Sequence, residues 1–273
     1  MKNIKQISNL DIPEIELYVG TRETHLLRYF EPEPGLFIAE SKKVMELALR
    51  RGYEPYHVLC TKKVMDDPIF DQVGDAPIHV VDGEKIRKKL GYNLPGEMTC
   101  AMRRKNTSNY KDVIKEAKRI VVLEDVENPT NVGAIFRSAA ALGVDAILLS
   151  PACSDPFYRR SIRVSMGNVL SVPWAYVCNT EAEWQETGID LLKKEGFTTC
   201  AMALREDNIT IDSPILKEKE KLAVIMGNEG NGLTPSTIDS CDYVAKIPMR
   251  NDVDSLNVAV AAGIAMWEMT HGI

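Results

Sequence analysis

From residue 118 onward, strand-like and helix-like segments alternate along the chain. Apolar runs typical of buried strands stand at RIVVLE, DAILLS, FTTCAMAL, KLAVIMG and YVAKIPM, and SVPWAYV has the pattern of a further strand. Among the helical patterns, residues 131–142 end at Gly143, a second helix begins at the capping box of Thr180 and Glu183, and a last helix covers about residues 255–269. This alternation predicts an α/β domain with a parallel sheet.

The N-terminal part of the sequence shows a smaller α/β pattern. Residues 36–39 and 56–60 are predicted strands around a helix that begins after Ser41 and ends at Gly52, which together form a βαβ unit. PIHVV adds a strand, and DGEKIRKKLGY adds a short helix closed by Gly91. The periodicity is then lost, so we place a boundary there. It separates an N-terminal domain, residues 1–110, from a C-terminal domain, residues 111–273.

Composition is typical of a soluble globular protein. The 273 residues are 45% hydrophobic, and no apolar run reaches the roughly 18 residues of a membrane span. No signal-peptide run occurs in the first sixteen residues, so we expect a cytoplasmic protein. The six cysteines are scattered and are expected to be buried thiols rather than disulfides or metal ligands. A net charge of −6 argues against indiscriminate coating of nucleic acid but allows a local basic site.

Loops that follow strands are the candidate sites, because ligands of open α/β sheets bind beyond the carboxyl ends of the strands. Three such loops stand out, at residues 124–137, 227–236 and 247–259. In the second, Gly227, Gly230 and Gly232 indicate either backbone close to a ligand or a plain tight turn. Their GxxGxG spacing reverses the dinucleotide fingerprint, and Glu229 among them would repel phosphates. A cationic or polar ligand therefore fits this loop better.

Polar residues in the other two loops need an explanation. Arg137 stands in a helix of small and apolar residues, where a permanent cation is unfavourable unless it meets an anion. That anion is either a ligand or a buried structural partner such as Glu124 or Asp125. In the third loop, Ser255 is expected to cap the last helix, whereas Asn257 either has a function or is merely solvated.

Together, the three loops resemble the SpoU/TrmH branch of the SPOUT RNA methyltransferases. That family carries Asn-x-Gly-Ala-x-x-Arg, then Gly-x-Glu-Gly-x-Gly, then Ile-Pro-Met followed by Ser-Leu-Asn-Val. Here the motifs are NVGAIFR at 131–137, GNEGNG at 227–232, IPM at 247–249 and SLNV at 255–258. Residues 35–60 resemble the small ribosomal-protein-like substrate domain that precedes the catalytic domain in many members. The chain departs from the family pattern at Asn251 and Ala259, where Gly and Ser are frequent.

The resemblance implies a deep trefoil knot in the parallel-sheet domain. It also implies methyl transfer from S-adenosylmethionine to a ribose 2′-hydroxyl of ribosomal or transfer RNA, with ribosomal RNA favoured, in a homodimer that needs no metal. The residues implied for catalysis are Arg137, Asn131, Glu229, Ser255 and Asn257, and those for cofactor binding are Gly227, Gly230, Gly232, Ile247, Met249 and Leu256. A non-catalytic RNA-binding or ribosome-assembly factor with the same fold is the alternative. A nicotinamide-dependent dehydrogenase is disfavoured by the reversed glycine spacing.

Arg137 has a family role that its chemistry calls into question. The family gives this arginine the proton of the ribose hydroxyl, but a group with a pKa above about 12 is a poor base. We expect Arg137 instead to hold the neighbouring phosphate and to stabilise the developing alkoxide.

Several basic clusters are candidates for contact with RNA. They are Arg159, Arg160 and Arg163 beside Phe157 and Tyr158; Arg103, Arg104 and Lys105; and Lys42, Lys43, Arg50 and Arg51. A solvated surface is the alternative for each cluster and is the usual state of charged helix faces, and a dimer contact is a further alternative for the first. The apolar last helix, with Val258, Val260, Ile264 and Trp267, is either part of a dimer interface or part of the core.

Overall fold

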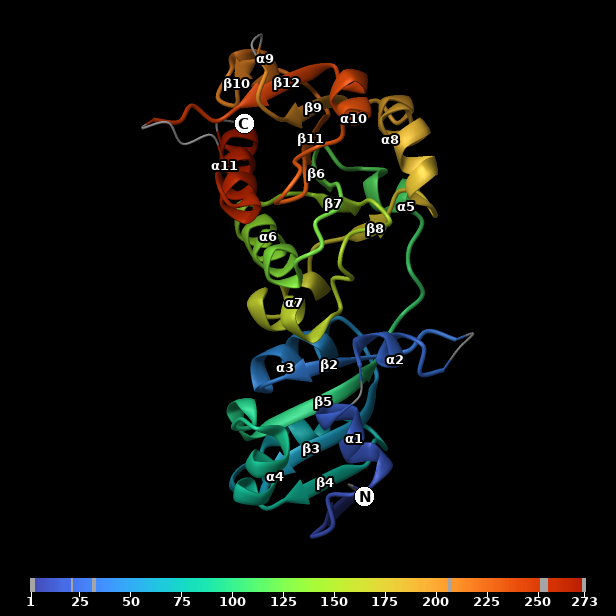
Figure 1. Ribbon diagram of the computed structural model, residues 1–273. Coiled ribbons are helices and arrows are strands. Elements are labelled where there is room, and N and C mark those ends of the chain that lie inside the picture. Colours follow the sequence, from blue (N-terminus) through green and yellow to red (C-terminus); the bar gives the residue numbers. More distant parts are fainter. Residues whose placement is uncertain (1–2, 21, 31–32, 206–207, 251–254, 272–273) are drawn as a thin grey trace. The chain divides into compact units, whose positions relative to one another are not determined.

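The structure is a computed structural model that describes residues 3–20, 22–30, 33–205, 208–250 and 255–271 (Figure 1). The chain forms two compact units. The first comprises Met1–Asn106 and Phe157–Leu170, and the second comprises Thr107–Pro156 and Ser171–Ile273. Asn251, one of the departures from the family pattern, lies outside the described residues.

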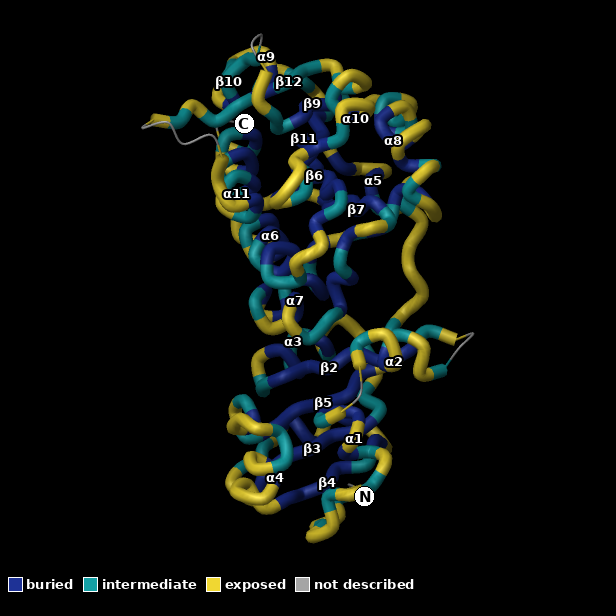
Figure 2. The backbone as a smooth tube through the Cα atoms, in the orientation of Figure 1, coloured by how far each residue is buried: buried dark blue, intermediate teal, exposed yellow. Residues whose placement is uncertain are grey.

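The first unit contains a five-stranded mixed sheet in the order β1-β4-β3-β5-β2. Its strands are β1 (Ile4–Gln6), β2 (Leu36–Glu40), β3 (Pro55–Thr61), β4 (Ile78–Val81) and β5 (Met98–Arg103). The predicted βαβ unit is correct in direction but wrong in adjacency, because β5 lies between β2 and β3 and pairs with both in antiparallel fashion. β2, β4 and β5 are buried along nearly their whole length, as the dark segments in Figure 2 show.

The helices of the first unit include α1 (Pro13–Val19), α2 (Glu23–Leu27), α3 (Lys42–Arg50) and α4 (Gly83–Leu90). The bounds of α3 and α4 agree largely with the sequence prediction, whereas α1 and α2 were not predicted. The Asp82 side chain accepts hydrogen bonds from the first amides of α4, and Gly91 ends that helix in the left-handed region at φ 81°. The sequence analysis missed β5, because MTCAMR alternates neither in polarity nor in size and contains few strong strand formers.

The segment 157–170 belongs to the first unit, although its position in the sequence placed it in the C-terminal domain. It carries α7 (Arg159–Val164). The Phe157 ring stacks on Phe37 of β2, with centroids 5.0 Å apart and an interplanar angle of 12°. These contacts are made with residues more than a hundred positions away, so local sequence patterns do not reveal them. The boundary near residue 110 is therefore not the only passage of the chain between the units.

The second unit contains a seven-stranded sheet in which every pairing is parallel, in the order β10-β12-β9-β11-β6-β7-β8. The strands are β6 (Arg119–Leu123), β7 (Ala146–Leu149), β8 (Trp174–Tyr176), β9 (Thr198–Met202), β10 (Ile209–Thr210), β11 (Leu222–Met226) and β12 (Tyr243–Lys246). The predicted parallel α/β fold class is confirmed by this sheet. The trefoil knot implied by the resemblance stays a prediction.

Helices cover both faces of the parallel sheet (Figure 1). One face of the sheet is covered by two helices that pack together, α6 (Pro129–Leu142) and α11 (Val258–Thr270). The other face is covered by α5 (Tyr110–Ile114), α8 (Glu181–Lys194) and α10 (Pro235–Ser240). The short α9 (Pro214–Lys217) contacts α11. Ile120 and Val122 of β6 share a core with Trp184 and Leu192 of α8. Since side chains alternate along a strand, Val121 and Leu123 face α6 and α11.

Two features bear on the expectations from composition. Within the described residues, no helix is both long and apolar enough to cross a bilayer. All six cysteines are free thiols, five of them buried and Cys241 partly buried, which confirms the predicted unpaired state.

Candidate cofactor and catalytic site

The strand order places a switch point between β6 and β11. From β6 the chain proceeds through β7 and β8 in one direction, and the remaining strands are added on the other side of β6. In open α/β sheets, ligands bind in a crevice outside the carboxyl ends of the strands at such a switch point. The first and second candidate loops follow the neighbouring strands β6 and β11 directly, so both loops lie at this point.

A cavity of about 470 Å³ lies at the carboxyl ends of β9, β11 and β12. This volume lies in the range of small-molecule and cofactor sites. All six residues predicted to bind a cofactor line it: Gly227, Gly230, Gly232, Ile247, Met249 and Leu256. Glu229 and Ser255, predicted to act in catalysis, line it too. The second and third candidate loops therefore enclose one space.

The glycines of the second loop are required by its shape. A Cβ atom on Gly227 would lie 2.4 Å from the backbone of Gly232 and of Leu233, so a side chain cannot fit there. Gly232 has a φ of 70°, in the left-handed region that favours glycine. The loop is thus a tight turn and a cavity wall at once, and the two interpretations of its sequence do not exclude each other.

Asn228 organises this loop, and the sequence analysis did not single it out. Its Oδ1 accepts hydrogen bonds from the amides of Gly230 at 2.7 Å and Asn231 at 3.2 Å. Its Nδ2 donates to the Asp125 carbonyl at 2.8 Å, which fastens the second loop to the first. An asparagine two residues before a glycine is a known signature of such turns and would have indicated the residue.

Three of the predicted catalytic residues meet, one from each loop. The Nδ2 of Asn131, a buried residue in the first turn of α6, donates to the Glu229 carboxylate. The Asn131 Oδ1 accepts from Asn257 Nδ2 at 3.1 Å. Asn131 therefore links the helix after β6 to both loops of the cavity.

The last helix is capped by Asn257, not by Ser255 as predicted. The Asn257 Oδ1 accepts hydrogen bonds from the amides of Ala259 at 3.0 Å and Val260 at 3.4 Å, so α11 begins at Val258. Ser255 lies two residues earlier, is exposed and faces the cavity. Asn257 thus has two structural roles, as the cap of α11 and as a hydrogen-bond partner of Asn131. The Ser255 side chain, which does not cap the helix, lies at the cavity.

Arg137 is not enclosed by apolar side chains, which corrects the premise drawn from its neighbours in sequence. α6 buries Val132, Ile135 and Phe136, whereas Arg137 is exposed. It does not line the cavity of its own chain. Within the described residues, its side chain makes no hydrogen bond or ion pair.

The suggested structural partners of Arg137 are bound elsewhere. Glu124 is 1% exposed and accepts hydrogen bonds from Trp184 Nε1 at 2.7 Å, from the Thr234 amide at 2.6 Å and from the Thr237 hydroxyl. Asp125 accepts a hydrogen bond from the Ser150 hydroxyl at 2.6 Å. A buried ion pair therefore does not account for Arg137.

A second carboxyl lies beside Asp125. Both carboxylate oxygens of Glu181, at the start of α8, are buried, and the Asp125 side chain and the Ala152 backbone lie beside them. Burial first, and then the neighbouring Asp125 carboxyl, raise the pKa of Glu181 to about 7. Within the described part of the chain, no three His, Cys, Asp or Glu side chains come together in a way that could hold a metal ion.

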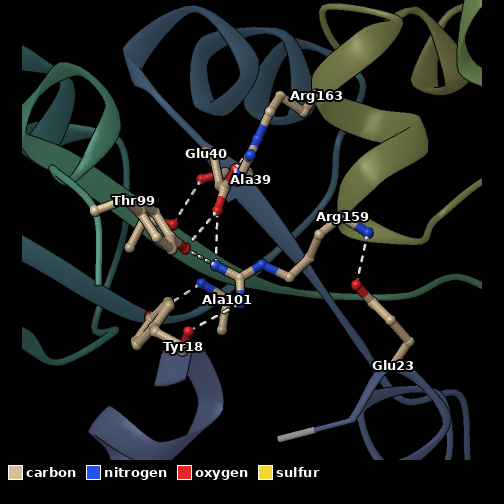
Figure 3. A network of polar contacts seen from close by, with 9 residues as sticks. Tyr18, Glu23, Ala39, Glu40, Thr99, Ala101, Arg159 and Arg163 are labelled. Carbon is tan, nitrogen blue, oxygen red and sulfur yellow. Dashed lines mark hydrogen bonds and ion pairs between the residues drawn. The ribbon is translucent and has the colours of Figure 1, made fainter. Parts of the chain in front are cut away.

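In the first unit, two of the arginines proposed for RNA contact are held by a buried carboxylate (Figure 3). The Glu40 side chain is 3% exposed and receives Arg159 Nη2 at 2.6 Å and Arg163 Nε at 2.7 Å. Arg159 also donates to the Tyr18 carbonyl at 2.9 Å and to the Tyr92 hydroxyl at 2.8 Å. These two arginines are not the free surface cations that their sequence suggested. Arg160 is exposed.

The second basic cluster lies on aromatic rings of the first unit. The guanidinium of Arg103 is 4.6 Å from the Phe30 ring centroid, and that of Arg104 is 4.6 Å from Phe157. Lys105 Nζ is 4.6 Å from the Tyr53 ring centroid and donates to the Arg51 carbonyl at 2.7 Å. Three consecutive cations therefore each face a ring.

Known proteins share both the sequence and the fold. Residues 118–267 match the model of the SpoU rRNA Methylase family. An uncharacterised tRNA/rRNA methyltransferase of Mycobacterium bovis is 35% identical over 87% of this chain and 81% of its own length. A putative TrmH family tRNA/rRNA methyltransferase of Staphylococcus aureus is 35% identical over 76% of this chain and 84% of its own.

Solved structures agree with these relatives. The crystal structure of an AdoMet-bound rRNA methyltransferase from Sinorhizobium meliloti superposes with a TM-score of 0.82 at 25% identity, covering 98% of this chain and 97% of that one. The family match spans all three candidate loops and the whole lined cavity. The chain therefore belongs to the SpoU rRNA methylase family.

Proposed function

We propose that this methyltransferase transfers a methyl group from S-adenosylmethionine to a ribose 2′-hydroxyl of ribosomal or transfer RNA, with ribosomal RNA favoured. The observation that carries the proposal is the cavity at the carboxyl ends of β9, β11 and β12. Its lining residue Glu229 accepts a hydrogen bond from Asn131, which in turn accepts one from Asn257. Relatives named as tRNA/rRNA methyltransferases support RNA as the substrate.

The residues of the cavity fit this cofactor. The backbone of the 227–232 turn offers amides and carbonyls for polar groups, while Met202, Leu256 and Val258 offer apolar walls for a ring. The Glu229 carboxylate suits a cationic ligand and disfavours phosphates. When bound, S-adenosylmethionine supplies an electrophilic methyl carbon on a positively charged sulfur.

The chain's own residues would act on the RNA. Ser255, exposed at the cavity, would position the ribose hydroxyl by hydrogen bonding. Asn131 and Asn257 would keep the loops in place around it. Arg137 would hold the adjacent phosphate and stabilise the developing negative charge, since a guanidinium with a pKa above about 12 rarely gives up its proton.

Arg137 does not line the cavity of its own chain, which suggests that it serves the cavity of a second copy. The residue is exposed and has no partner among the described residues. α11, which packs against α6, exposes Val260 to 53% and Trp267 to 50%. Large exposed apolar side chains mark association surfaces, and a twofold pair of such helices would bury them. We infer a homodimer in which Arg137 of one protomer serves the cavity of its partner.

Mixed dimers test this arrangement. Arg137→Ala leaves the cavity intact, and Gly227→Val distorts the cavity wall, because its side chain meets the backbone of Gly232 and Leu233, but leaves Arg137 in place. Each variant alone should be inactive. Co-expressed, they should form heterodimers with one complete site, which gives about a quarter of the wild-type rate. If the co-expressed variants show no activity although mass spectrometry detects heterodimers, Arg137 acts within its own chain.

Ribose methylation is tested directly with purified protein, labelled S-adenosylmethionine and total RNA from cells that lack the gene. A 2′-O-methyl group blocks alkaline cleavage of the next phosphodiester, so the label should appear in alkali-resistant dinucleotides. Label released with the bases would overturn the ribose assignment. Calorimetry separates the alternative of a non-catalytic RNA-binding or assembly factor, because a folded protein that binds no S-adenosylmethionine would support that alternative.

A further inference from the structure

A second cavity, of about 350 Å³, lies wholly within the first unit. Its lining includes Glu14, Tyr56, His57, Asp75 and Arg103. None of these residues takes part in the site at the carboxyl ends of β9, β11 and β12. The cavity therefore has chemistry of its own that needs an explanation.

Arg103 is the exposed cation of this cavity, and it rests on aromatic rings. Its guanidinium is 4.6 Å from the Phe30 centroid and 5.2 Å from that of Tyr56. Tyr29, Phe30 and Tyr56 pack edge to face around one another, with centroids 4.9 to 5.7 Å apart. Tyr29 is 40% exposed. The rings orient the guanidinium and leave part of the platform open.

Among the described residues, no hydrogen bond uses the side-chain donors of Arg103. In the described part of the chain, the Arg103 side chain forms no hydrogen bond and no ion pair, although five N–H groups are available. A guanidinium stacked on a ring can still donate in its own plane, so stacking and hydrogen bonding do not compete. Arg103 is thus prepared to bind an anion or to stack on a planar group.

The remaining walls present acceptors rather than cations. Glu14 and Asp75 supply carboxylates. His57 is 1% exposed, and its ring nitrogens lie 2.8 Å from the Tyr18 hydroxyl and 3.0 Å from the His79 ring. Burial and the neighbouring His79 lower the pKa of His57 to about 3, so it is neutral at physiological pH. Carboxylates repel a phosphate but accept hydrogen bonds from the amino and imino groups of a base.

We propose that this cavity binds one unpaired nucleotide of the RNA substrate and prefers guanine. The base would stack on the Tyr56 and Arg103 platform, with Arg103 reaching the phosphate, which is the arrangement that single-stranded RNA binding uses elsewhere. Guanine presents two adjacent donors, N1–H and N2–H₂, to a carboxylate, whereas uracil presents one donor between two acceptors. The proposal rests on the proposed action on RNA and specifies where part of that RNA binds.

The test measures binding of short RNA to the full chain by fluorescence anisotropy. The probes are a labelled hexauridine and the same oligonucleotide with one central guanosine. We expect the guanosine probe to bind about tenfold more tightly, which is within the range of one stacked and hydrogen-bonded base. Arg103→Gln and Tyr56→Leu should each lower that affinity about tenfold, and Glu14→Gln should reduce the preference for guanosine over uridine.

Arg87→Gln is the matched control. Arg87 is an exposed arginine of α4 in the same unit and does not line the cavity, so its replacement removes the same charge. It should change the affinity less than twofold. If Arg103→Gln or a correctly folded Tyr56→Leu binds the guanosine probe as wild type does, or if the wild-type protein binds both probes equally, the proposal is overturned.

Failure of the proposed function would look different. The same preparations are assayed for methyl transfer to total RNA. If Arg103→Gln binds the guanosine probe as tightly as wild type does, and the wild-type protein methylates RNA, only the assignment of the nucleotide cavity is overturned. Absence of any methyl transfer, with the Arg103 and Tyr56 effects on binding intact, overturns the methyltransferase proposal and leaves the cavity assignment standing.

Discussion

The arginines of α7 and the arginine of α6 lie in opposite environments. Arg159 and Arg163 share the buried Glu40 carboxylate in the first unit, whereas Arg137 in the second unit is exposed and lacks a partner among the described residues. From sequence, the α7 arginines seemed free to meet RNA, and Arg137 seemed enclosed. The comparison shows that contacts across the fold, and not neighbours in sequence, decide whether a cation is structural or available to a ligand.

The largest effect that follows from this comparison is on stability. Glu40→Gln removes the charge that Arg159 faces, and the Arg159 side chain is only 18% exposed. Because an uncompensated buried charge remains, we expect the free energy of unfolding to fall by about 3 kcal/mol. Urea denaturation of the full chain measures it.

The control for Glu40 is an exposed pair of the same unit. Glu84→Gln breaks the contact between Glu84 and Lys88, whose side chains are 68% and 70% exposed, and should cost less than about 0.5 kcal/mol. Equal effects of the two substitutions would show that burial of Glu40 contributes nothing and would remove the contrast between α7 and α6.

Replacement of Arg137 should change activity greatly and stability little, the opposite of what we expect for Glu40. Arg137→Ala is expected to lower kcat about 100- to 1000-fold, as loss of a charge-stabilising donor does. The free energy of unfolding should change by less than about 0.5 kcal/mol, because the side chain is exposed and makes no ion pair with the described residues. Single-turnover methylation and urea denaturation measure the two quantities.

Arg137→Lys separates the two chemical roles of this residue. If the cation acts electrostatically, the variant keeps part of the activity and its pH–rate profile has the wild-type shape. If the residue is the base, a lysine with a pKa near 10.4 introduces a new limb at neutral to moderately alkaline pH. Such a limb would contradict the electrostatic role.

Asn131 tests the junction of the three loops, with a smaller effect. Asn131→Ala removes the hydrogen bonds to Glu229 and Asn257 and leaves polar groups of both without that partner. We expect the Kd for S-adenosylmethionine to rise about tenfold, equivalent to roughly 1.4 kcal/mol. Calorimetry measures it.

Asn257→Ser distinguishes this junction from the helix cap. Serine can still accept a hydrogen bond from the first amides of α11, but it cannot reach Asn131 as the amide does. A weaker cofactor affinity with nearly unchanged stability would assign the effect to the junction. Unchanged affinity in both variants would mean that the loops hold their shape without Asn131.

Local patterns were sufficient for the parallel sheet, whereas the residues of the cavity walls came from the resemblance to the SpoU/TrmH family. Helix ends at Gly91 and Gly143 followed from their left-handed backbone, and the turn at Gly227 followed from glycine spacing. The strand β5 and the place of residues 157–170 could not be predicted, because both are fixed by partners distant in sequence. The exposure of Arg137 was missed for a related reason: small neighbours along a helix do not show which face is covered.

Two carboxylates, Glu40 and Glu181, also lie in opposite environments. The expected effect of this difference on the free energy of unfolding is the smallest of those described. Glu40 faces two cations, whereas the carboxyl of Glu181 is buried beside a second carboxyl, that of Asp125, and its pKa is raised from 4.5 to about 7. The folded state therefore holds a proton that the unfolded state releases between these values. Its stabilising effect is complete below pH 4.5 and is lost as the pH rises through 7.

Glu181→Gln replaces the carboxyl with a group that stays neutral. At pH 5 the variant and the wild type should be about equally stable, and at pH 8 the variant should be more stable by about 1 kcal/mol, less than the full shift because the residue is partly exposed. Glu186→Gln, an exposed position on the same helix, should show no such pH dependence. A constant difference in stability between Glu181→Gln and wild type from pH 5 to pH 8 would mean that the pKa of Glu181 is not raised by burial and by the Asp125 carboxyl. The contrast between the environments of Arg137 and of the α7 arginines would then have no counterpart among the carboxylates.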